Sequence, residues 1–270
     1  MSPAGPSDAL TRCEVGVSVL LTPQWAAPAC VGSLMSTRSG GVSTAPWHSL
    51  NLSYSVGDDA AAVAVNRERV FMGSGATPRW LHLTHSAAVH RWRHGDDAAL
   101  SPLADAAWTS ESGLACVVTA ADCMPVLFST RDGSAVAAAH AGWRGLAGGI
   151  LENTVTALCE GTGCTGSDIV AWLGPCIGPE HFEVGADVLA AFAADVDDPD
   201  TTRFQPRPRT DGSRAWLAKL PQLARERLRT VGVTQVSDSA LCTVQDASRF
   251  FSHRRDRVTG RMCAAVWRRA

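Results

Sequence analysis

Apolar and polar positions alternate along this chain in short runs that are separated by longer amphipathic stretches. Runs of apolar and β-branched residues predict strands, and apolar residues spaced three or four positions apart predict helices. The predicted strands are 15–21, 116–119, 125–128, 135–139, 169–173 and 262–267. The predicted helices are 147–159, 187–194 and 217–231. Because strands and helices alternate, the pattern indicates an α/β fold.

The remaining segments define the expected ends and loops of the domain. Residues 1–12 are predicted to be a disordered lead, so a single domain is expected over residues 13–270. Residues 131–134 form a predicted turn, and 195–213 are rich in Asp, Pro, Arg and Thr, which is typical of a surface loop. We find no internal repeat and no linker, and we therefore expect one α/β domain with mixed β-sheets flanked by helices.

The composition is that of a folded globular protein. The chain has 270 residues, of which 46% are hydrophobic and 19% charged, and its net charge is −2. This balance offers no bulk electrostatic attraction for nucleic acid or for an anionic membrane. No apolar stretch approaches the ~18 residues of a membrane-spanning helix, and the run at 15–21 lacks the positively charged segment that precedes a secretory signal. We therefore expect a cytoplasmic protein.

The nine cysteines exclude a fully paired disulfide framework because their number is odd. None of them forms a Cys-x-x-Cys motif, and the chain is far longer than a disulfide-dense secreted scaffold. Most of them are therefore expected to be small buried hydrophobic residues in a reducing compartment. Two lie in distinctive motifs. Cys123 has an Asp-Cys-x-Pro setting, and Cys176, in Gly-Pro-Cys-Ile-Gly-Pro, is a candidate pocket-wall residue.

Cys123 and His140 each lie at the edge of a predicted strand, and 17 positions separate them. A hairpin-like pair of strands would bring both side chains to one rim of a sheet. There, a thiolate beside an imidazole is either a nucleophile with its base or a pair of ligands for one metal ion. The third interpretation is a buried cysteine near an unrelated histidine, and spacing alone leaves all three open.

A histidine-rich stretch upstream offers a further ligand. His85 lies just beyond a strand-like start at 80–81, and with Cys123 and His140 it would form a three-ligand zinc site with an open fourth position. That arrangement is typical of a catalytic rather than a structural zinc. The sequence does not distinguish among the four histidines of this stretch, which are His82, His85, His90 and His94. The alternative is a solvated polar face.

Three clusters of polar residues and glycine are candidate ligand-binding loops. They fall within residues 36–43, 49–67 and 252–261, and each contains arginine. Glycine lets the backbone approach a ligand closely, and arginine offers a planar fork of donors to phosphate. Taken singly, each cluster is also explained by a capped turn with solvated arginines.

Several blocks of the chain share their residues and their order with one known family. They are 37–43, 50–52, 56–59, 119–125, 140–145, 173–179, 182–184 and 252–261. The pair formed by Asp-Cys-x-Pro at 122–125 and His-Ala-Gly-Trp-Arg-Gly at 140–145 is highly specific. Through these blocks the chain resembles the bacterial laccase-domain family, also called the polyphenol-oxidase-like, peptidoglycan editing factor or purine nucleoside phosphorylase family.

The resemblance implies a fold and a metal site. The fold would be a single α/β domain with mixed sheets, resembling the cysteine-hydrolase-like fold of the laccase-domain family. The family's zinc site of two histidines and one cysteine maps onto His85, Cys123 and His140. The family's first histidine usually follows Gln-Val and precedes Gly, whereas this chain has Leu83 and Ser86 in place of the glutamine and the glycine. The metal ligand is retained, but a polar neighbour on the substrate side is lost.

The resemblance also implies purine nucleoside chemistry, namely phosphorolysis of adenosine, inosine, guanosine and methylthioadenosine, and deamination of adenosine. Zinc is the implied cofactor, and purine nucleosides and phosphate are the implied small-molecule partners. A zinc with an open position can lower the pKa of bound water toward ~7, which suits deamination. Phosphorolysis needs an anion held beside C1′ of the ribose.

Roles for individual residues follow from this resemblance as hypotheses. The catalytic residues would be Cys123, His140 and Asp122. The substrate-binding residues would be Arg38, Asn51, Arg144 and Arg254. In these assignments Asp122 orients a ligand or carries a proton, Asn51 contacts the nucleoside, and the arginines hold phosphate.

Two other functions stay open. The first is a metal-free hydrolase that acts on a wrongly built cell-wall precursor, with Cys123 as nucleophile and His140 as base. The second is a non-catalytic binding module of cell-wall or division machinery. Copper oxidation, which the laccase label suggests, is not expected, because it needs a further histidine-rich cluster and the eight histidines contain no His-x-His pair. The oligomeric state is left open.

Overall fold

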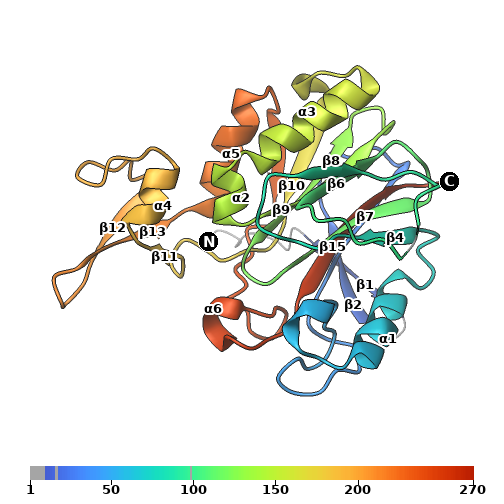
Figure 1. Cartoon of the computed structure of the whole chain (residues 1–270), viewed down its shortest axis with the longest axis horizontal. Helices are drawn as coiled ribbons and strands as arrows, with labels where there is room; N and C mark the ends of the chain where they lie inside the picture. Colours follow the sequence, from blue (N-terminus) through green and yellow to red (C-terminus); the bar gives the residue numbers. More distant parts are fainter. Residues whose placement is uncertain (1–9, 16–17, 98) are drawn as a thin grey trace, which may run out of the picture.

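Two six-stranded sheets form the centre of the molecule (Figure 1). The computed structural model describes residues 10–15, 18–97 and 99–270. The first sheet has the order β1 (Leu10–Val15), β2 (Ser18–Pro23), β3 (Val31–Ser36), β15 (Met262–Arg268), β7 (Leu114–Ala120), β4 (Thr77–Trp80). Its strands pair antiparallel except for β4, which lies parallel to β7. The sheet is therefore mixed, as the sequence predicts.

The second sheet is also mixed, and a third, smaller sheet projects from one side of the molecule (Figure 1). The second sheet has the order β14 (Gln235–Asp238), β10 (Ile169–Leu173), β8 (Met124–Thr130), β9 (Val136–Ala141), β6 (Ala106–Thr109), β5 (Val89–Arg91). Its two edge strands pair parallel with their neighbours, whereas the central pairs are antiparallel. The third sheet has the order β11 (Glu183–Val184), β13 (Arg214–Ala218), β12 (Phe204–Pro208).

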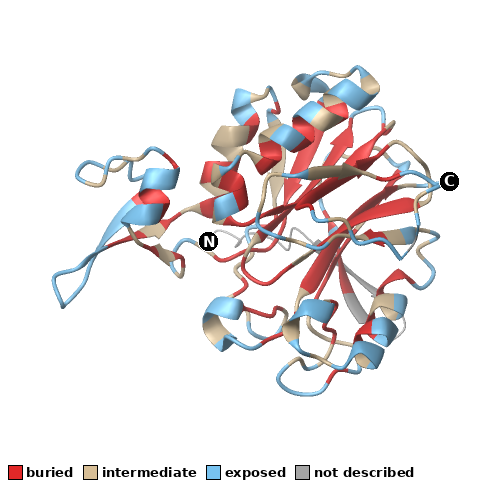
Figure 2. Ribbon diagram, viewed as in Figure 1, coloured by how far each residue is buried: buried red, intermediate tan, exposed pale blue. Residues whose placement is uncertain are grey.

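Side chains that alternate along the strands divide the core into layers. Val118 on β7 and Leu127 on β8 belong to one buried cluster, which fills the space between the two large sheets. Their neighbours point the other way: Val117 belongs to a cluster on the outer face of the first sheet, and Val126 to a cluster on the outer face of the second. Both faces of each large sheet are therefore buried, and buried positions run the length of the central strands (Figure 2).

Helices cover the two outer faces. Val155 of α3 (Ile150–Thr162) and Leu223 of α5 (Leu220–Thr230) pack on the second sheet, and Val70 of α1 (Ala60–Phe71) packs on the first. The shorter helices are α2 (Trp143–Ala147), α4 (Ala186–Ala191) and α6 (His253–Asp256), and single 3-10 turns are η1 (Tyr54–Val56) and η2 (Gly166–Asp168). Within the described residues, no helix combines the length and apolar character needed to cross a membrane.

Most of the predicted strands are confirmed, and one is divided. The runs at 116–119, 125–128, 169–173 and 262–267 lie within β7, β8, β10 and β15, and 135–139 overlaps β9. The run at 15–21 is split between β1 and β2, because the chain reverses there and Val15 pairs with Ser18. Residues 16–17 lie outside the described residues. Of the predicted lead, residues 10–12 belong to β1, and residues 1–9 lie outside the described part.

The interpretation of 195–213 as a loop is wrong where β12 lies. Phe204 is buried there. Pro206 and Pro208 made the segment look like a loop, but proline is tolerated because β12 is the edge of its sheet. The helix predicted at 217–231 begins only at Leu220, since β13 precedes it, and the helix predicted at 187–194 ends at Ala191.

Two glycines set the ends of the helix predicted at 147–159. Gly149, with a φ of 92°, separates α2 from α3, so α3 begins at Ile150. Gly163, with a φ of 77°, ends it after Thr162.

Candidate metal centre

The hairpin of β8 and β9 brings Cys123 and His140 to one edge of the second sheet. Pro125 on β8 pairs with His140 on β9, and Cys123 directly precedes β8. His140 is buried and Cys123 is half-buried. Together with His85 they form one group of candidate metal ligands. The structure therefore brings together the two residues whose approach the spacing predicts.

His85 reaches this group from the segment that follows β4. Its Nε2 lies 3.8 Å from Cys123 Sγ, and its ring centroid lies 4.8 Å from that of His140, with the ring planes at 83°. One ligand atom from each of the three residues lies within 4.8 Å of the others. Of the four histidines in this stretch, His85 is thus the one that joins Cys123 and His140, whereas His82 lines the adjoining cavity.

A buried aspartate that the sequence analysis missed organises the group. Asp105 has no exposed surface, and its Oδ1 lies 2.9 Å from Nδ1 of His140. The same carboxylate accepts hydrogen bonds from the backbone N–H groups of Thr84, His85 and Ser86. Asp105 therefore holds the His85 segment and the His140 ring at once. Because Nδ1 of His140 faces the carboxylate, Nε2 is the ring nitrogen left for a ligand.

Asp105 also bonds the side chains on either side of His85. The hydroxyl groups of Thr84 and Ser86 donate to Oδ2 of Asp105 at 3.0 and 2.8 Å. A sequence signal for Asp105 does exist, since it lies within the apolar run 104–108. A carboxylate is almost never fully buried unless it is paired, so an aspartate in such a run indicates a buried partner.

The electrostatics of the group favour a thiolate beside an imidazolium in the metal-free protein. Burial would raise the pKa of Cys123, but the charge of His140 and hydrogen bonds from His140 and His85 lower it to about 6. Burial would lower the pKa of His140, but Cys123 and Asp105 raise it to about 9. Burial also opposes ionisation of Asp105, whereas hydrogen bonds from His140 and Ser86 hold its pKa well below the usual range. Cys123 thus offers, at neutral pH, the thiolate that metal binding requires.

The donor set can hold a metal ion. Two imidazoles and one thiolate are typical zinc ligands, and three protein ligands leave a coordination position open. The carboxylate on the far nitrogen of His140 is the outer contact that usually accompanies a metal-binding histidine. A Cβ on Gly142 would lie 2.8 Å from Cys123 Sγ and 3.2 Å from Cδ2 of His85. Glycine at this position therefore keeps the space beside the ligands free.

The ligand group lines a cavity of about 620 Å³ that carries positive charge. Its walls include three arginines and four histidines, which are Arg67, Arg144, Arg261, His82, His85, His140 and His253. Among the described residues that line it, none is acidic. A smaller cavity of about 180 Å³ shares His85 and Cys123 with the first and has the apolar walls Trp143 and Phe182. The site is therefore suited to a ligand that combines an anion with an apolar, planar part.

Two of the predicted substrate-binding arginines lie at these cavities. Arg144 is exposed and lines both. Arg254 lines the smaller cavity, and its Nη1 donates to the backbone carbonyls of His181 and Glu183. Both side chains can reach a ligand, but one guanidinium nitrogen of Arg254 is already used in hydrogen bonds to the backbone.

The other two predicted substrate-binding residues hold the loops around the larger cavity. Asn51 is fully buried, its amide N–H group donates to Asp58, and its amide oxygen accepts from the backbone N–H of Arg261. Arg38 donates to the carbonyls of His48 and Ala247. Neither of the two is among the residues that line the larger or the smaller cavity.

Asp122 positions the segment that carries Cys123. It is buried, with a φ of 89°. Its Oδ1 accepts from the Thr243 hydroxyl and its Oδ2 from the Arg254 backbone N–H, both at 2.6 Å. Its own carbonyl accepts from Ile177 N–H at 2.9 Å. Asp122 therefore ties three segments together, and the carboxylate that contacts a ligand imidazole is that of Asp105.

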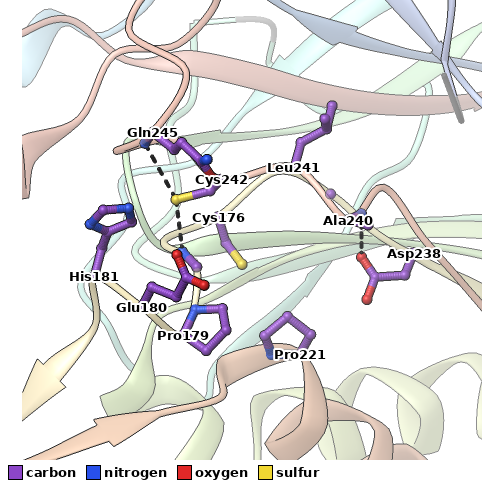
Figure 3. Close-up of a pocket in the computed structure, with 12 residues that line it drawn as sticks. Cys176, Pro179, Glu180, His181, Pro221, Asp238, Ala240, Leu241, Cys242 and Gln245 are labelled. Carbon is purple, nitrogen blue, oxygen red and sulfur yellow. Dashed lines mark hydrogen bonds between the residues drawn. The ribbon is translucent and has the colours of Figure 1, made fainter. Parts of the chain in front are cut away.

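A separate cavity of about 360 Å³ lies beside this region (Figure 3). Cys176 and Cys242, which form an isolated parallel bridge, both line it. Backbone N–H groups of Gly178 and Gln245 donate to Cys242 Sγ at 3.2 and 3.4 Å. Ile177, between Cys176 and Gly178, lines the smaller cavity near the ligand group instead. Cys176 is therefore a pocket-wall residue, as expected, but of a different pocket.

Comparison with known proteins places this chain in one family. The family described as multi-copper polyphenol oxidoreductase laccase matches residues 32–269, and the chain belongs to it. A purine nucleoside phosphorylase of Pseudomonas aeruginosa is 45% identical over 247 residues, which cover 92% of this chain and 97% of that protein. The purine nucleoside phosphorylase YfiH of Escherichia coli is 44% identical over 253 residues, which cover 93% and 99%.

Solved structures show the same fold. A crystal structure of a Neisseria meningitidis protein superposes with a TM-score of 0.82 at 43% identity, covering 93% of this chain and 99% of that one. YlmD from Geobacillus stearothermophilus superposes with a TM-score of 0.83 at 31% identity, covering 97% of this chain and 100% of that one. The α/β fold that the sequence predicts is confirmed at this level.

Proposed function

We propose that this protein is a zinc-dependent purine nucleoside enzyme that cleaves nucleosides with phosphate and deaminates adenosine. The nucleosides we propose for cleavage are adenosine, inosine, guanosine and methylthioadenosine. One observation carries the proposal. The group of His85, Cys123 and His140 lines a cavity of about 620 Å³ whose described walls hold three arginines and no acidic residue. The names of the relatives at 44–45% identity support the phosphorolytic part.

The larger cavity suits the phosphate, and the smaller cavity suits the purine ring of the nucleoside. The cationic walls of the larger cavity favour a phosphate anion. The smaller cavity offers Trp143 and Phe182 to a planar purine ring. Because His85, Cys123 and Arg144 line both cavities, a nucleoside that spans the two would pass directly over the ligand group.

The chain's own residues hold and orient the reacting groups. A zinc ion bound by His85, Cys123 and His140 would supply Lewis acidity beside the purine. Asp105 keeps the proton of His140 on Nδ1, and Asp122 positions the segment before Cys123. Of the arginines that sequence analysis assigned to phosphate, we retain Arg144 as the one that lines the larger cavity.

The test is to incubate zinc-loaded protein with adenosine, with and without phosphate, and to identify the purine products. Inosine that forms without phosphate indicates deamination. Free adenine or hypoxanthine that forms only with phosphate indicates phosphorolysis. We expect both, and the absence of both products would contradict the proposal and would favour a non-catalytic binding module.

A specific observation favours a metal-free cysteine hydrolase as the second candidate. Cys123, His140 and Asp105 form a chain of nucleophile, base and orienting carboxylate, with the pKa of Cys123 lowered to about 6 by the charge of His140, against the effect of burial. In such a hydrolase His85 would hold no metal and would act on Cys123 only through a hydrogen bond that lowers its pKa. Metal analysis of protein purified without added metal separates the two candidates, since an active, metal-free enzyme that tolerates His85→Ala would be a hydrolase.

Copper oxidation is not part of the proposal, although the family's description mentions it. A multicopper oxidase needs a histidine-rich copper cluster in addition to a site of two histidines and one cysteine. Within the described residues, the group of His85, Cys123 and His140 is the one set of three candidate ligands that lie together. We therefore expect copper-loaded protein to leave phenols unoxidised.

A further inference from the structure

Arg67 is a cation that the protein holds in place without neutralising it. It comes from α1, and its guanidinium lies over the rings of Tyr54 and Trp80, at 4.3 and 3.8 Å from their centroids. Its Nε donates to the Leu52 carbonyl at 2.8 Å. Within the described part of the chain, its two terminal nitrogens make no hydrogen bond and no carboxylate pairs with it. Burial lowers its pKa to about 10, so it is charged at neutral pH.

Arg261 is a second such cation. Its Nη1 donates to the carbonyls of Thr259 and Gly260 at 3.0 and 3.1 Å. Its Nε and Nη2 make no hydrogen bond to any described residue, and it forms no ion pair with one. Burial lowers its pKa, and the charges of Cys123 and Asp122 partly offset that effect. Arg261 therefore lies within the electrostatic reach of the ligand group.

Leu52 connects the two arginines through its backbone. Its N–H donates to the Arg261 carbonyl at 3.1 Å, and its own carbonyl accepts from Arg67 Nε. Asn51 adds a third link, because its Oδ1 accepts from the backbone N–H of Arg261 at 2.9 Å. Two cations that form no ion pair with a described residue therefore line the same cavity of about 620 Å³, and residues 51–52 bond to both arginines.

We infer that Arg67 and Arg261 form the phosphate-binding subsite of this cavity. Each offers free N–H groups of a planar fork, which match the oxygens of a phosphate dianion. A partly buried cation without a carboxylate is costly, and a bound anion relieves that cost. The inference rests on the proposed function, because phosphorolysis is what requires the anion. The two arginines take the place of Arg38 and Arg254, because neither of those lines the larger cavity, whereas Arg144 lines it with them.

The same chemistry suits free inorganic phosphate and the phosphate of a nucleoside monophosphate, and we assign the subsite to inorganic phosphate. The test uses zinc-loaded wild type, Arg67→Gln and Arg261→Gln. Arg67→Lys, which keeps the charge and part of the stacking, covers the case in which Arg67→Gln fails to fold. Arg214→Gln is the matched control, because Arg214 is an exposed arginine on β13 that pairs with Asp197.

We expect the KM for phosphate in inosine cleavage to rise about tenfold or more in each glutamine variant, since each substitution removes charge-assisted hydrogen bonds to the anion. Deamination of adenosine without phosphate should fall far less than phosphate-dependent cleavage, and the control should match wild type in both reactions. Calorimetric affinity for inorganic phosphate should fall by the same factor as the KM rises. Arg67→Lys should lie between wild type and Arg67→Gln.

Three results would overturn the inference. The first is an unchanged KM for phosphate in both glutamine variants. The second is an equal loss of cleavage and deamination, which would assign the arginines to the nucleoside. The third is calorimetric binding of adenosine monophosphate but not of inorganic phosphate. If wild type cleaves no nucleoside, the proposed function fails, and calorimetry still decides the subsite, since phosphate binding that both variants lose supports it.

Discussion

At the scale of single residues, Asp105 determines how the candidate ligands are held. It bonds to Nδ1 of His140 and to the backbone of the segment that carries His85, and it does so from a fully buried position. Because both histidines depend on one carboxylate, a change there acts on two of the three ligands. Asp105 is a positioning residue, and its effect should appear in metal affinity.

We predict that Asp105→Asn weakens zinc binding about 10–100-fold, which is the usual cost of losing the outer partner of a metal-binding histidine. The substitution keeps the shape of the side chain but removes its charge and places an amide against the N–H donors of Thr84 and Ser86. Competition with a chromophoric chelator measures the affinity. Asp132→Asn, in an exposed turn, is the control, and wild-type affinity in Asp105→Asn would refute the positioning role.

A second prediction concerns Cys123 in the metal-free protein. Its pKa is lowered to about 6 because the charge of His140 and the hydrogen bonds from both histidines outweigh burial. The thiolate is therefore present above pH 6 and lost below it, and alkylation by iodoacetamide should rise with pH to a midpoint near 6. His140→Gln should move that midpoint toward higher pH, and zinc should protect the thiol. A midpoint near that of an ordinary thiol in wild type would argue against the described electrostatics.

The residue scale also shows what the sequence could predict about the site. Cys123 and His140 were predictable because one hairpin carries both, and the hairpin follows from local strand patterns. Asp105 was not predicted because it directly precedes β6, and only the folded sheet places β6 beside β9, which carries His140. The sequence does not indicate Arg67 and Arg261 as ligands, because nothing local reveals that no carboxylate of the described residues pairs with them.

At the scale of elements, the site depends on where β9 ends and α2 begins. Gly142 caps α2 with a φ of −69°, a value that any residue can adopt. A side chain is excluded there by space alone, since its Cβ would lie 2.8 Å from Cys123 Sγ. The junction between β9 and α2 thus determines how much space lies beside the ligand group.

We therefore predict that Gly142→Ala lowers zinc affinity and turnover about tenfold or more, with the fold intact. The physical reason is steric, because Cys123 must shift by several tenths of an ångström to accept the methyl group. Zinc titration and circular dichroism of the same samples separate the two effects. Gly95→Ala, where no atom lies within 4 Å of the added Cβ, is the control. A Gly142→Ala protein that binds zinc like wild type would contradict this account of the junction.

Elements far from the site were harder to predict. The small sheet was missed because Pro206 and Pro208 make β12 look like a loop, and only its place at a sheet edge makes proline acceptable. The central strands β7, β8, β9, β10 and β15 were predictable, because each is a near-continuous apolar run. The buried strands β3 and β6 were not predicted. The order of the strands in the sheets was not predictable, since it is set by pairings between distant segments, such as β15 with β3.

At the scale of the whole molecule, the ligand group lies where the chain passes from one large sheet to the other. His85 lies in the segment between β4 of the first sheet and β5 of the second, whereas Cys123 and His140 belong to the β8–β9 hairpin of the second. A metal ion bound by all three would therefore cross-link this connecting segment to the hairpin in the native state. An ion that binds the folded chain and not the unfolded one stabilises the fold by mass action.

We predict that a chelator lowers the Tm of zinc-loaded protein, and that adding zinc back restores it. At free zinc near 100 times its Kd, the stabilisation is about 2.7 kcal/mol, which corresponds to several degrees in Tm. Differential scanning calorimetry measures the shift. His94→Ala, an exposed histidine outside the ligand group, should respond to chelator as wild type does. A Tm that chelator does not change would show that no metal stabilises the fold through this group.

The central claim is that His85, Cys123 and His140 bind one zinc that serves purine nucleoside chemistry. The most direct test measures zinc content and phosphate-dependent release of hypoxanthine from inosine in the same preparations of wild type, His85→Ala and Cys123→Ala. The account predicts about one zinc per chain and turnover in wild type, and the loss of both in each variant. A metal-free wild type that releases hypoxanthine, or a His85→Ala protein that remains active, would contradict it.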